Sequence, residues 1–426
     1  ILIILHELGH FVFAKLFNTR VEKFYLFFNP GFSIFKFKKG ETEYGMGWLP
    51  LGGYVKISGM IDESMDKEQM KQPPQPFEFR SKPAWQRLLI MTGGVLVNFL
   101  LAMFIYSMML FAWGEQYLPA ENAKYGIYAD SVALEMGLQH GDKIVSVGGE
   151  QVDNFSSIAP KILLDNVQSL TIERNGNQIE IPVRDDIISR LIKSPSFVEP
   201  RFPFYVDEFS EDGVAKDAGF QKGDRIVGIN DSTTLFFDQF KRLLQNYKGE
   251  KVNVMVERNG NTITIPVTVP ESGILGIRPV VDLSEFFELK TVQYSFFESF
   301  PAGVKKGINT VSSYLKQFRL LFKPETKAYE SVGGFLKIGS FFPGEWNWVI
   351  FWNMTAFLSI ILAVMNILPI PALDGGHVMF LLYEMVTGRK PGDKFLEYAQ
   401  IVGMVLLLAL LVYANGNDIV QYFFKN

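Results

Sequence analysis

The sequence predicts a polytopic α-helical membrane protein with about four transmembrane helices, a membrane-associated β-hairpin region and two inserted small β-rich domains. Hydrophobic residues make up 48% of the 426 residues and charged residues only 20%, which is more apolar than an ordinary soluble enzyme. Long apolar runs lie towards both ends of the chain, whereas the middle is polar and contains an internal repeat. A membrane protein that carries soluble domains fits these three observations.

Composition excludes several kinds of chemistry. The chain has no cysteine, so disulfides, thiolate zinc ligands and a cysteine nucleophile are excluded. Its formal net charge of −4 gives no indication of nucleic-acid binding. The apolar run that begins at Ile1 is short for the roughly 20 residues that a transmembrane helix needs. We therefore expect further residues before it.

Residues 1–20 are predicted to form the first transmembrane helix, which carries the motif H-E-x-x-H at His6, Glu7 and His10. Histidines four positions apart lie one above the other on a helix, so both can reach a single Zn²⁺ at about 2.0–2.1 Å. Glu7 is close enough to take a proton from a water at the metal. Such a motif also arises by chance on surface helices. This helix, however, is apolar almost all round, where each ionisable residue needs a partner.

Residues 21–84 predict short β-strands followed by a linker. The stretch up to residue 60 is rich in aromatic and β-branched residues and is interrupted by turn residues such as Asn29-Pro30-Gly31. Two interpretations stay open for it: a sheet that dips into the bilayer, surrounded by protein or water, or a small cytosolic β-subdomain. Residues 62–82 are charged and proline-rich, as in a linker.

Residues 85–114 predict the second transmembrane helix, because the run from 88 to 113 is apolar and long enough to span a membrane. Asn98 lies within this run and needs a hydrogen-bond partner at that depth. It either stabilises the packing of helices or contacts the backbone of a substrate.

Residues 115–190 and 200–272 each predict one small β-rich domain. Both contain Gly-x-Gln-x-Gly-Asp and, further on, Glu-Arg-Asn-Gly-Asn, whose Asn-Gly pair is a β-hairpin signal. These segments resemble the PDZ domain, which often binds chain termini or adds a peptide strand to a sheet edge. The pair could equally act as a steric filter that binds nothing, so both interpretations stay open.

The last third of the chain predicts an amphipathic region and two more transmembrane helices. Residues 284–345 contain mixed segments rich in Lys and Phe, typical of a helix that lies along the membrane face. The third transmembrane helix is assigned to residues 346–388, with a break at Pro369 and Pro371. The fourth covers residues 396–415.

The distribution of Lys and Arg predicts the orientation in the membrane. The loop between the first two transmembrane helices and the short loop at 388–394 are both rich in these residues, which favours the cytoplasmic side. The β-rich pair then lies on the opposite side, and Asp374 returns to the same leaflet as His6 and His10.

Asp374 is the best candidate for a third zinc ligand, because catalytic zinc takes three protein ligands and keeps one open position. It lies where Pro369 and Pro371 break a membrane helix, and the two glycines after it allow a close approach of backbone. Weaker candidates are His377, Asp130 and Asp142.

Two motifs and the inserted PDZ domains give the chain a family resemblance. H-E-x-x-H at 6–10 and N-x-x-P-x-P-x-L-D-G-G at 366–376 look like those of the site-2 protease family of intramembrane zinc proteases, in its bacterial form with tandem PDZ domains. Segments 50–56 and 85–98 are also similar to family segments. The resemblance therefore covers essentially the whole chain.

The resemblance implies a zinc ion on His6, His10 and Asp374, with Glu7 as the catalytic base. It also implies cleavage, inside the membrane, of single-span proteins that another protease has already trimmed, such as anti-sigma factors, and of remnant signal peptides. It implies a multi-pass protein of the bacterial inner membrane, surrounded by lipid, with periplasmic PDZ domains and an active site near the cytoplasmic side.

Substrate contacts are implied in the same way. The hairpin at 44–57 would pair with an extended substrate strand, and Asn366 would hold substrate backbone. Ile361 stands where many members carry a second asparagine, so a clamp of two asparagines is not expected here. The predicted substrate-binding residues are Tyr44, Gly45, Gly47, Asn98, Asn366 and Pro369.

Two functions from other classes are the alternatives. One is a non-catalytic membrane scaffold that presents PDZ domains, but the intact set of His6, Glu7, His10 and Asp374 disfavours it. The other is a metal transporter, which the few spans and a glutamate beside the histidine pair disfavour.

Overall fold

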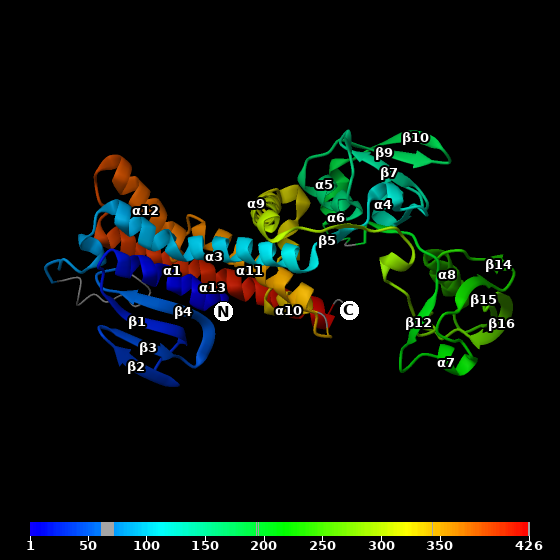
Figure 1. Ribbon diagram of the computed structural model, residues 1–426, viewed down its shortest axis with the longest axis horizontal. Helices are drawn as coiled ribbons and strands as arrows, with labels where there is room; N and C mark the ends of the chain where they lie inside the picture. Colours follow the sequence, from blue (N-terminus) through cyan, green and yellow to red (C-terminus); the bar gives the residue numbers. More distant parts are fainter. Residues whose placement is uncertain (61–71, 193, 195, 343, 425–426) are drawn as a thin grey trace. The chain divides into compact units, whose positions relative to one another are not determined.

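The computed structural model describes residues 1–60, 72–192, 194, 196–342 and 344–424, and it divides into two compact units (Figure 1). The membrane unit comprises Ile1–Gly114, Gln293–Arg319 and Val332–Asn426. The repeat unit comprises Glu115–Val292 and Leu320–Ser331. Of the predicted linker, residues 62–71 lie outside the described residues.

The membrane unit is built mainly on apolar helices. These are α1 (Leu2–Leu16), α3 (Ala84–Trp113), α11 (Trp348–Ile367), α12 (Asp374–Thr387) and α13 (Asp393–Phe424), with α9 (Phe296–Leu320) and α10 (Phe335–Ser340) in the predicted amphipathic region. Three of the described helices are long and apolar enough to cross a membrane, over residues 84–113, 348–367 and 394–423. Helix α1, the predicted first transmembrane helix, has 15 residues and is not one of these three. A fourth transmembrane helix therefore stays a prediction.

Helix α3 is the element on which α1, α11 and α12 pack, because all three contact it. Gly9 and Gly93 meet where α1 crosses α3. A β-carbon on either glycine would collide with the backbone of the other. The absence of side chains here lets the two helices approach closely, as small residues do between membrane helices.

A four-stranded sheet packs against α1. Its strands are β1 (Val21–Phe28), β2 (Phe35–Lys39), β3 (Thr42–Met46) and β4 (Leu49–Ile57), in the order β2-β3-β1-β4. The expectation of a hairpin over residues 44–57 is wrong, because β1 lies between β3 and β4 and pairs with both. Among the described strands, β4 is at one end of the sheet and its outer edge is unpaired.

The segment assigned to one helix at 346–388 forms two, and α12 follows α11 after a break at residues 368–373. Pro369 and Pro371 lack the N–H groups that a continuous helix would need there. Asp374 is therefore the first residue of a new helix rather than a residue inside a span. Helix α13 is longer than the predicted 396–415.

The repeat unit contains two copies with the same sheet order. In the first copy the sheet runs β10-β9-β7-β8, and in the second β16-β15-β13-β14. The strands are β7 (Lys143–Val147), β8 (Glu150–Gln151), β9 (Ser169–Arg174), β10 (Asn177–Pro182), β13 (Arg225–Ile229), β14 (Ser232–Thr233), β15 (Lys251–Arg258) and β16 (Asn261–Thr268).

Three two-stranded sheets and short helices complete this unit. The sheets pair β6 (Ile127–Ala129) with β11 (Val198–Pro200), β12 (Val206–Phe209) with β17 (Ile277–Pro279), and β5 (Glu115–Tyr117) with β18 (Lys290–Val292). The helices are α4 (Ser131–Met136), α5 (Ile158–Leu164), α6 (Asp185–Leu191), α7 (Ala215–Ala218) and α8 (Phe237–Leu244). Short 3₁₀ turns of this unit cover 120–122, 155–157, 245–247, 283–285, 324–326 and 328–331, and one more at 79–81 precedes α3 in the membrane unit.

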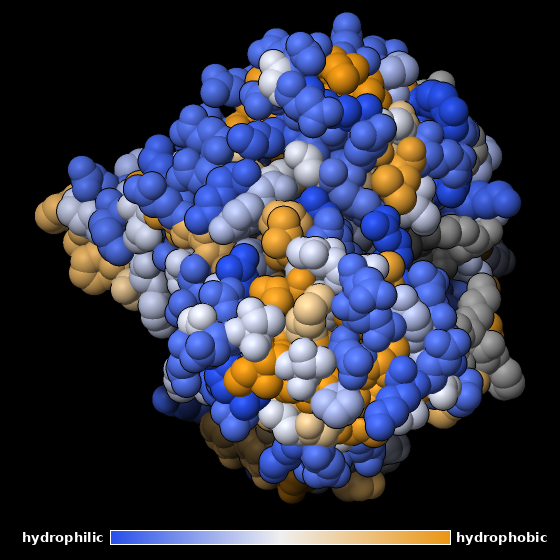
Figure 2. All heavy atoms as spheres, turned by 90° about the vertical axis from the view of Figure 1, so that its right-hand side faces the viewer, coloured by the Kyte–Doolittle hydropathy of each residue, from blue (hydrophilic) through white to orange (hydrophobic). Residues whose placement is uncertain are grey.

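The surface of the repeat unit differs from that of a membrane helix. Figure 2, which views the right-hand side of Figure 1, shows hydrophilic side chains over most of that face and apolar ones gathered in smaller patches. Buried apolar residues form a separate core in each copy. Each copy therefore has an apolar core of its own.

The residues that the two copies share form the same buried ion pair. Asp142 is 2% exposed and receives a fork from Arg174, whose Nε and Nη2 donate to its carboxylate oxygens at 2.8 Å each. Asp224 and Arg258 repeat this arrangement at 2.6 and 2.7 Å. Each arginine also donates to the carbonyl oxygen of the first glycine in Gly-x-Gln-x-Gly-Asp. The fork keeps the pKa of Arg174 above its usual value.

We expect Arg174→Ala to destabilise the first copy by about 3 kcal/mol, because it leaves the buried Asp142 carboxylate without its partner. Arg258→Ala should do the same to the second copy. Thermal unfolding and limited proteolysis of the whole chain measure both effects.

Arg278→Ala is the matched control, because Arg278 pairs with Glu208 on the surface with both side chains more than half exposed. Its effect should stay within about 0.5 kcal/mol. An equal loss in all three variants would contradict a special role for the buried pairs.

Candidate active site

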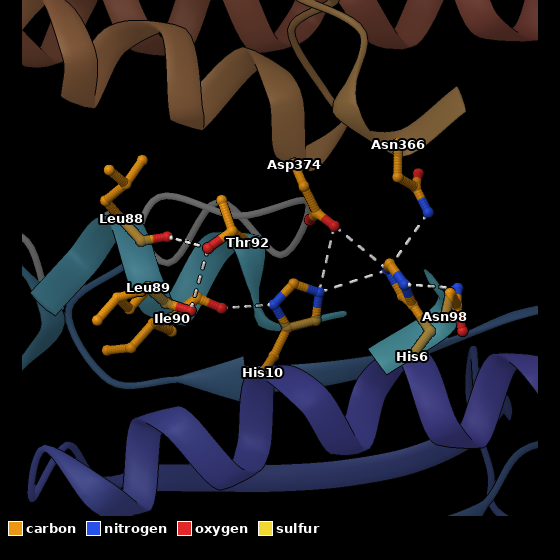
Figure 3. Close-up of polar contacts among 9 residues, drawn as sticks. All are labelled: His6, His10, Leu88, Leu89, Ile90, Thr92, Asn98, Asn366 and Asp374. Atoms are coloured by element: carbon orange, nitrogen blue, oxygen red, sulfur yellow. Dashed lines mark hydrogen bonds and ion pairs between the residues drawn. The ribbon is translucent and has the colours of Figure 1, made fainter. Parts of the chain in front are cut away.

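Three side chains from two distant parts of the sequence meet at one point (Figure 3). Oδ2 of Asp374 lies 3.3 Å from Nε2 of His6 and 3.3 Å from Nε2 of His10. The two Nε2 atoms are 3.4 Å apart. Both histidines are 7% exposed. The predicted triad is thus brought together in a largely buried position.

The local structure explains why these atoms face one another. His6 and His10 are four residues apart on α1 and point to the same side, as the spacing predicts. Asp374 is the first residue of α12, so its side chain extends from the end of the helix and not from its side. Gly94 of α3 lies against both rings, where a β-carbon would collide with them. The rings therefore have no alternative position on this side.

A hydrogen bond on the far side of the His10 ring decides which of its two nitrogens carries the proton. Nδ1 of His10 lies 2.9 Å from the carbonyl oxygen of Ile90, which can only accept, so Nδ1 carries the proton. In a neutral imidazole the Nε2 atom is then an acceptor. With His10 neutral, the lone pair of its Nε2 atom therefore points towards Oδ2 of Asp374.

These converging acceptors fit a bound cation. Oδ2 of Asp374 is buried and accepts no hydrogen bond within the described part of the chain. One ligand atom each from His6, His10 and Asp374 lies within 4.8 Å of the others. Two imidazole nitrogens and a carboxylate oxygen are a donor set that zinc takes at catalytic sites. The residues present therefore fit the metal that the motif predicts.

Asn98 does not lie where a substrate could reach it, so the structure corrects its predicted role. It is 0% exposed, and its Nδ2 lies 3.1 Å from Nδ1 of His6. Half a rotation of the amide exchanges its nitrogen and oxygen, so either end can face the ring. With a metal on Nε2, Nδ1 of His6 would donate to Oδ1 of Asn98. Asn98 thus supports His6 from behind.

The other predicted substrate contacts lie in two different places. Asn366, in the last turn of α11, has its Nδ2 3.3 Å from Nε2 of His6 and stays at the site. Pro369 is exposed in the connection that follows. Tyr44, Gly45 and Gly47 are away from the site: Tyr44 packs against Phe11 and Phe24 of the membrane unit.

Tyr44 and Gly45 lie in β3, which has a neighbouring strand on each side, so β3 has no free edge for a substrate strand. The N–H of Gly47 already donates to the carbonyl oxygen of Leu26 at 2.8 Å. A strand could be added only at an end of the described sheet, at β2 or at β4, and β4 is the end strand that packs against α1. If a substrate strand pairs with this sheet beside the triad, it therefore pairs with β4 and not with Tyr44, Gly45 or Gly47.

A cavity of about 640 Å³ lies beside the triad. Its walls come from α1, from β1 and β4, and from the start of α12 with part of α13. Glu7 lines it next to both histidines, opposite Gly53 and Val55 of β4. The lining residues that sequence reasoning did not assign to the site are Lys23, Phe28, Asn29, Pro30, Met60, Met91, Ala372, Gln400 and Met404. Of these, Gln400 carried a usable signal, as a polar residue in an apolar helix.

Comparisons with known proteins agree with this geometry. The family model described as peptidase family M50 matches residues 1–410. A Regulator of sigma-E protease RseP of Escherichia coli is 28% identical over 98% of this chain and 96% of its own length. A Regulator of sigma E protease of Haemophilus influenzae is 27% identical over 99% of this chain and 96% of its own length. A Vibrio cholerae protein provisionally named a zinc metalloprotease is 28% identical over 98% of this chain and 96% of its own length.

The support of His6 by Asn98 predicts a metal-affinity phenotype. Asn98→Leu should weaken zinc binding by about 10- to 100-fold, because the His6 ring loses the group that fixes its protonation and orientation. Asn98→Asp, which keeps an acceptor oxygen, should bind zinc at least as tightly as the unchanged chain. Competition with a fluorescent chelator measures both.

Ser359→Ala is the control for packing, since Ser359 is fully buried and donates to the backbone oxygen of Asn98 at 2.9 Å. The Ser359→Ala variant should bind zinc with the same affinity as the unchanged chain. Equal losses for Asn98→Leu and Ser359→Ala would point to packing alone and contradict the role given to the amide.

Proposed function

The chain belongs to peptidase family M50 and is an intramembrane metalloprotease of the site-2 type, and we propose that its substrates are the membrane segments of single-span proteins. The observation that carries the proposal is the meeting of His6, His10 and Asp374 beside Glu7, in a cavity bounded by a free strand edge. A metal site, a base and a place for extended backbone are thus adjacent.

We assign the metal to His6, His10 and Asp374, and the base to Glu7. Zn²⁺ held by these three residues would supply Lewis-acid chemistry to a peptide carbonyl. Glu7 would accept the proton of the attacking water and then deliver it to the nitrogen of the leaving amine. Asn366, whose Nδ2 lies 3.3 Å from Nε2 of His6, would donate from Nδ2 to substrate backbone.

A transmembrane substrate hides its carbonyl groups in the hydrogen bonds of its helix, so it must unwind before it is cut. The outer edge of β4 offers a partner for the unwound segment. Gly53, Tyr54, Val55, Lys56 and Ile57 of this strand line the cavity beside the triad. Backbone pairing along them would hold the substrate extended and place successive side chains on opposite faces.

The substrate class follows from the site and from the relatives. Two relatives are named regulators of sigma-E protease, which supports anti-sigma-factor-like proteins as substrates, together with remnant signal peptides. The two repeat copies would act as PDZ domains that either recruit these proteins or exclude untrimmed ones. In this proposal the enzyme lies in the bacterial inner membrane, with the repeat unit periplasmic and the site near the cytoplasmic leaflet.

The proposal predicts that Glu7→Gln keeps a single zinc ion per chain and loses about 10²- to 10⁴-fold in cleavage rate, because the amide cannot take the proton. The assay uses the purified chain in detergent with a model single-span substrate, and zinc is counted in the same sample.

Glu41→Gln serves as the control, because Glu41 is exposed in the turn between β2 and β3. It should cleave like the unchanged chain. Full cleavage by a zinc-loaded Glu7→Gln variant would rule out Glu7 as the base.

A further inference from the structure

The connection between α11 and α12 has an unusual backbone conformation two residues before Asp374. Ala372 has a φ of 77°, in the left-handed region that residues with a β-carbon rarely adopt. Such a conformation persists only when surrounding contacts impose it. The contacts that impose the conformation of Ala372 also decide where the Asp374 carboxylate lies.

One contact comes from Gln400 of α13. Its Oε1 accepts a hydrogen bond from the N–H of Ala372 at 3.1 Å. Gln400 is 7% exposed, although it belongs to an apolar membrane-spanning helix. A buried amide is costly there unless it has a partner, and the strained residue provides one.

A second contact lies one turn along the same face of α13. Gly403 is buried against Pro371, and a β-carbon on it would collide with the Pro371 carbonyl group. On other faces of the helix, Val402 and Val405 are 65% and 60% exposed. Helix α13 thus touches the connection at two successive residues, 371 and 372, through Gly403 and Gln400.

We infer that Gln400, with Gly403, is a positioning residue for the metal site. Gln400 holds Ala372 in its left-handed conformation, and this turns the chain so that Asp374 starts α12 with Oδ2 at 3.3 Å from both histidines. Without the hydrogen bond, Ala372 relaxes to negative φ and the carboxylate leaves its place. The inference rests on the proposed zinc assignment of His6, His10 and Asp374.

The test measures metal binding separately from cleavage. Gln400→Met keeps the length of the side chain and removes the acceptor, and it should weaken zinc binding about tenfold or more, as loss of a supporting contact does. The visible spectrum of the Co²⁺-loaded chain should change as well, since it reports how the ligands are arranged. Gln421→Met, the same change elsewhere on α13, should leave both unchanged.

The decisive variant is the double change Ala372→Gly with Gln400→Met. Glycine adopts positive φ without steric cost, so the connection no longer needs the amide. Zinc affinity should return to within about threefold of that of the unchanged chain. Unchanged zinc binding in Gln400→Met, or no recovery in the double variant, would overturn the inference.

Two further outcomes keep the inference apart from the proposed function. Gly403→Ala forces α13 away from Pro371 while Gln400 is kept, so it should weaken zinc binding even if Gln400→Met does not fold. Wild-type zinc binding in Gly403→Ala would then overturn the inference. If the unchanged chain binds zinc but cuts no substrate, the protease proposal fails while the zinc titrations still decide the role of Gln400.

Discussion

Two imidazole nitrogens and a carboxylate oxygen converge inside an apolar helix bundle as ligands would around one cation, and the membrane unit is arranged to keep them there. His10 is held by the carbonyl of Ile90, His6 by Asn98, and Asp374 by the backbone turn before it. Each ligand is thus fixed by a group that does not itself face the cation position. Support of this kind sets the direction of a ligand's lone pair, which distance alone does not.

Helix α3 makes this support possible, because it contacts α1, α11 and α12 and so is common to both halves of the site. Gly93 brings α3 close to α1, and Ile90 and Asn98 then lie beside the two histidine rings. Nearer its start, the buried Arg87 donates to Glu384 of α12 at 2.5 Å. This ion pair ties the helix that carries Asp374 to the helix that supports the histidines.

In the proposed function, the outer edge of β4 and the metal site act together, because both border the same cavity. A protease that acts inside a membrane must first expose the backbone of a helical substrate, and an unpaired strand edge beside the ligands offers hydrogen bonds in exchange. Such edges usually risk unwanted pairing between chains. Here the edge borders a cavity, next to α1 and the start of α12, which restricts what can pair with it.

The sequence by itself indicated the family, the proposed ligand triad with Glu7, and the polar repeat, because these depend on local spacing and composition that are readable along the chain. The two histidines share a helix face at i and i+4, and Asp374 is marked by the prolines that break its helix. Only the tertiary structure decided that β4 carries the free edge, that Asn98 supports His6, and that Gln400 holds Ala372. Strand order and contacts between helices far apart in sequence leave no local pattern, and the φ of an alanine is imposed by its neighbours in space.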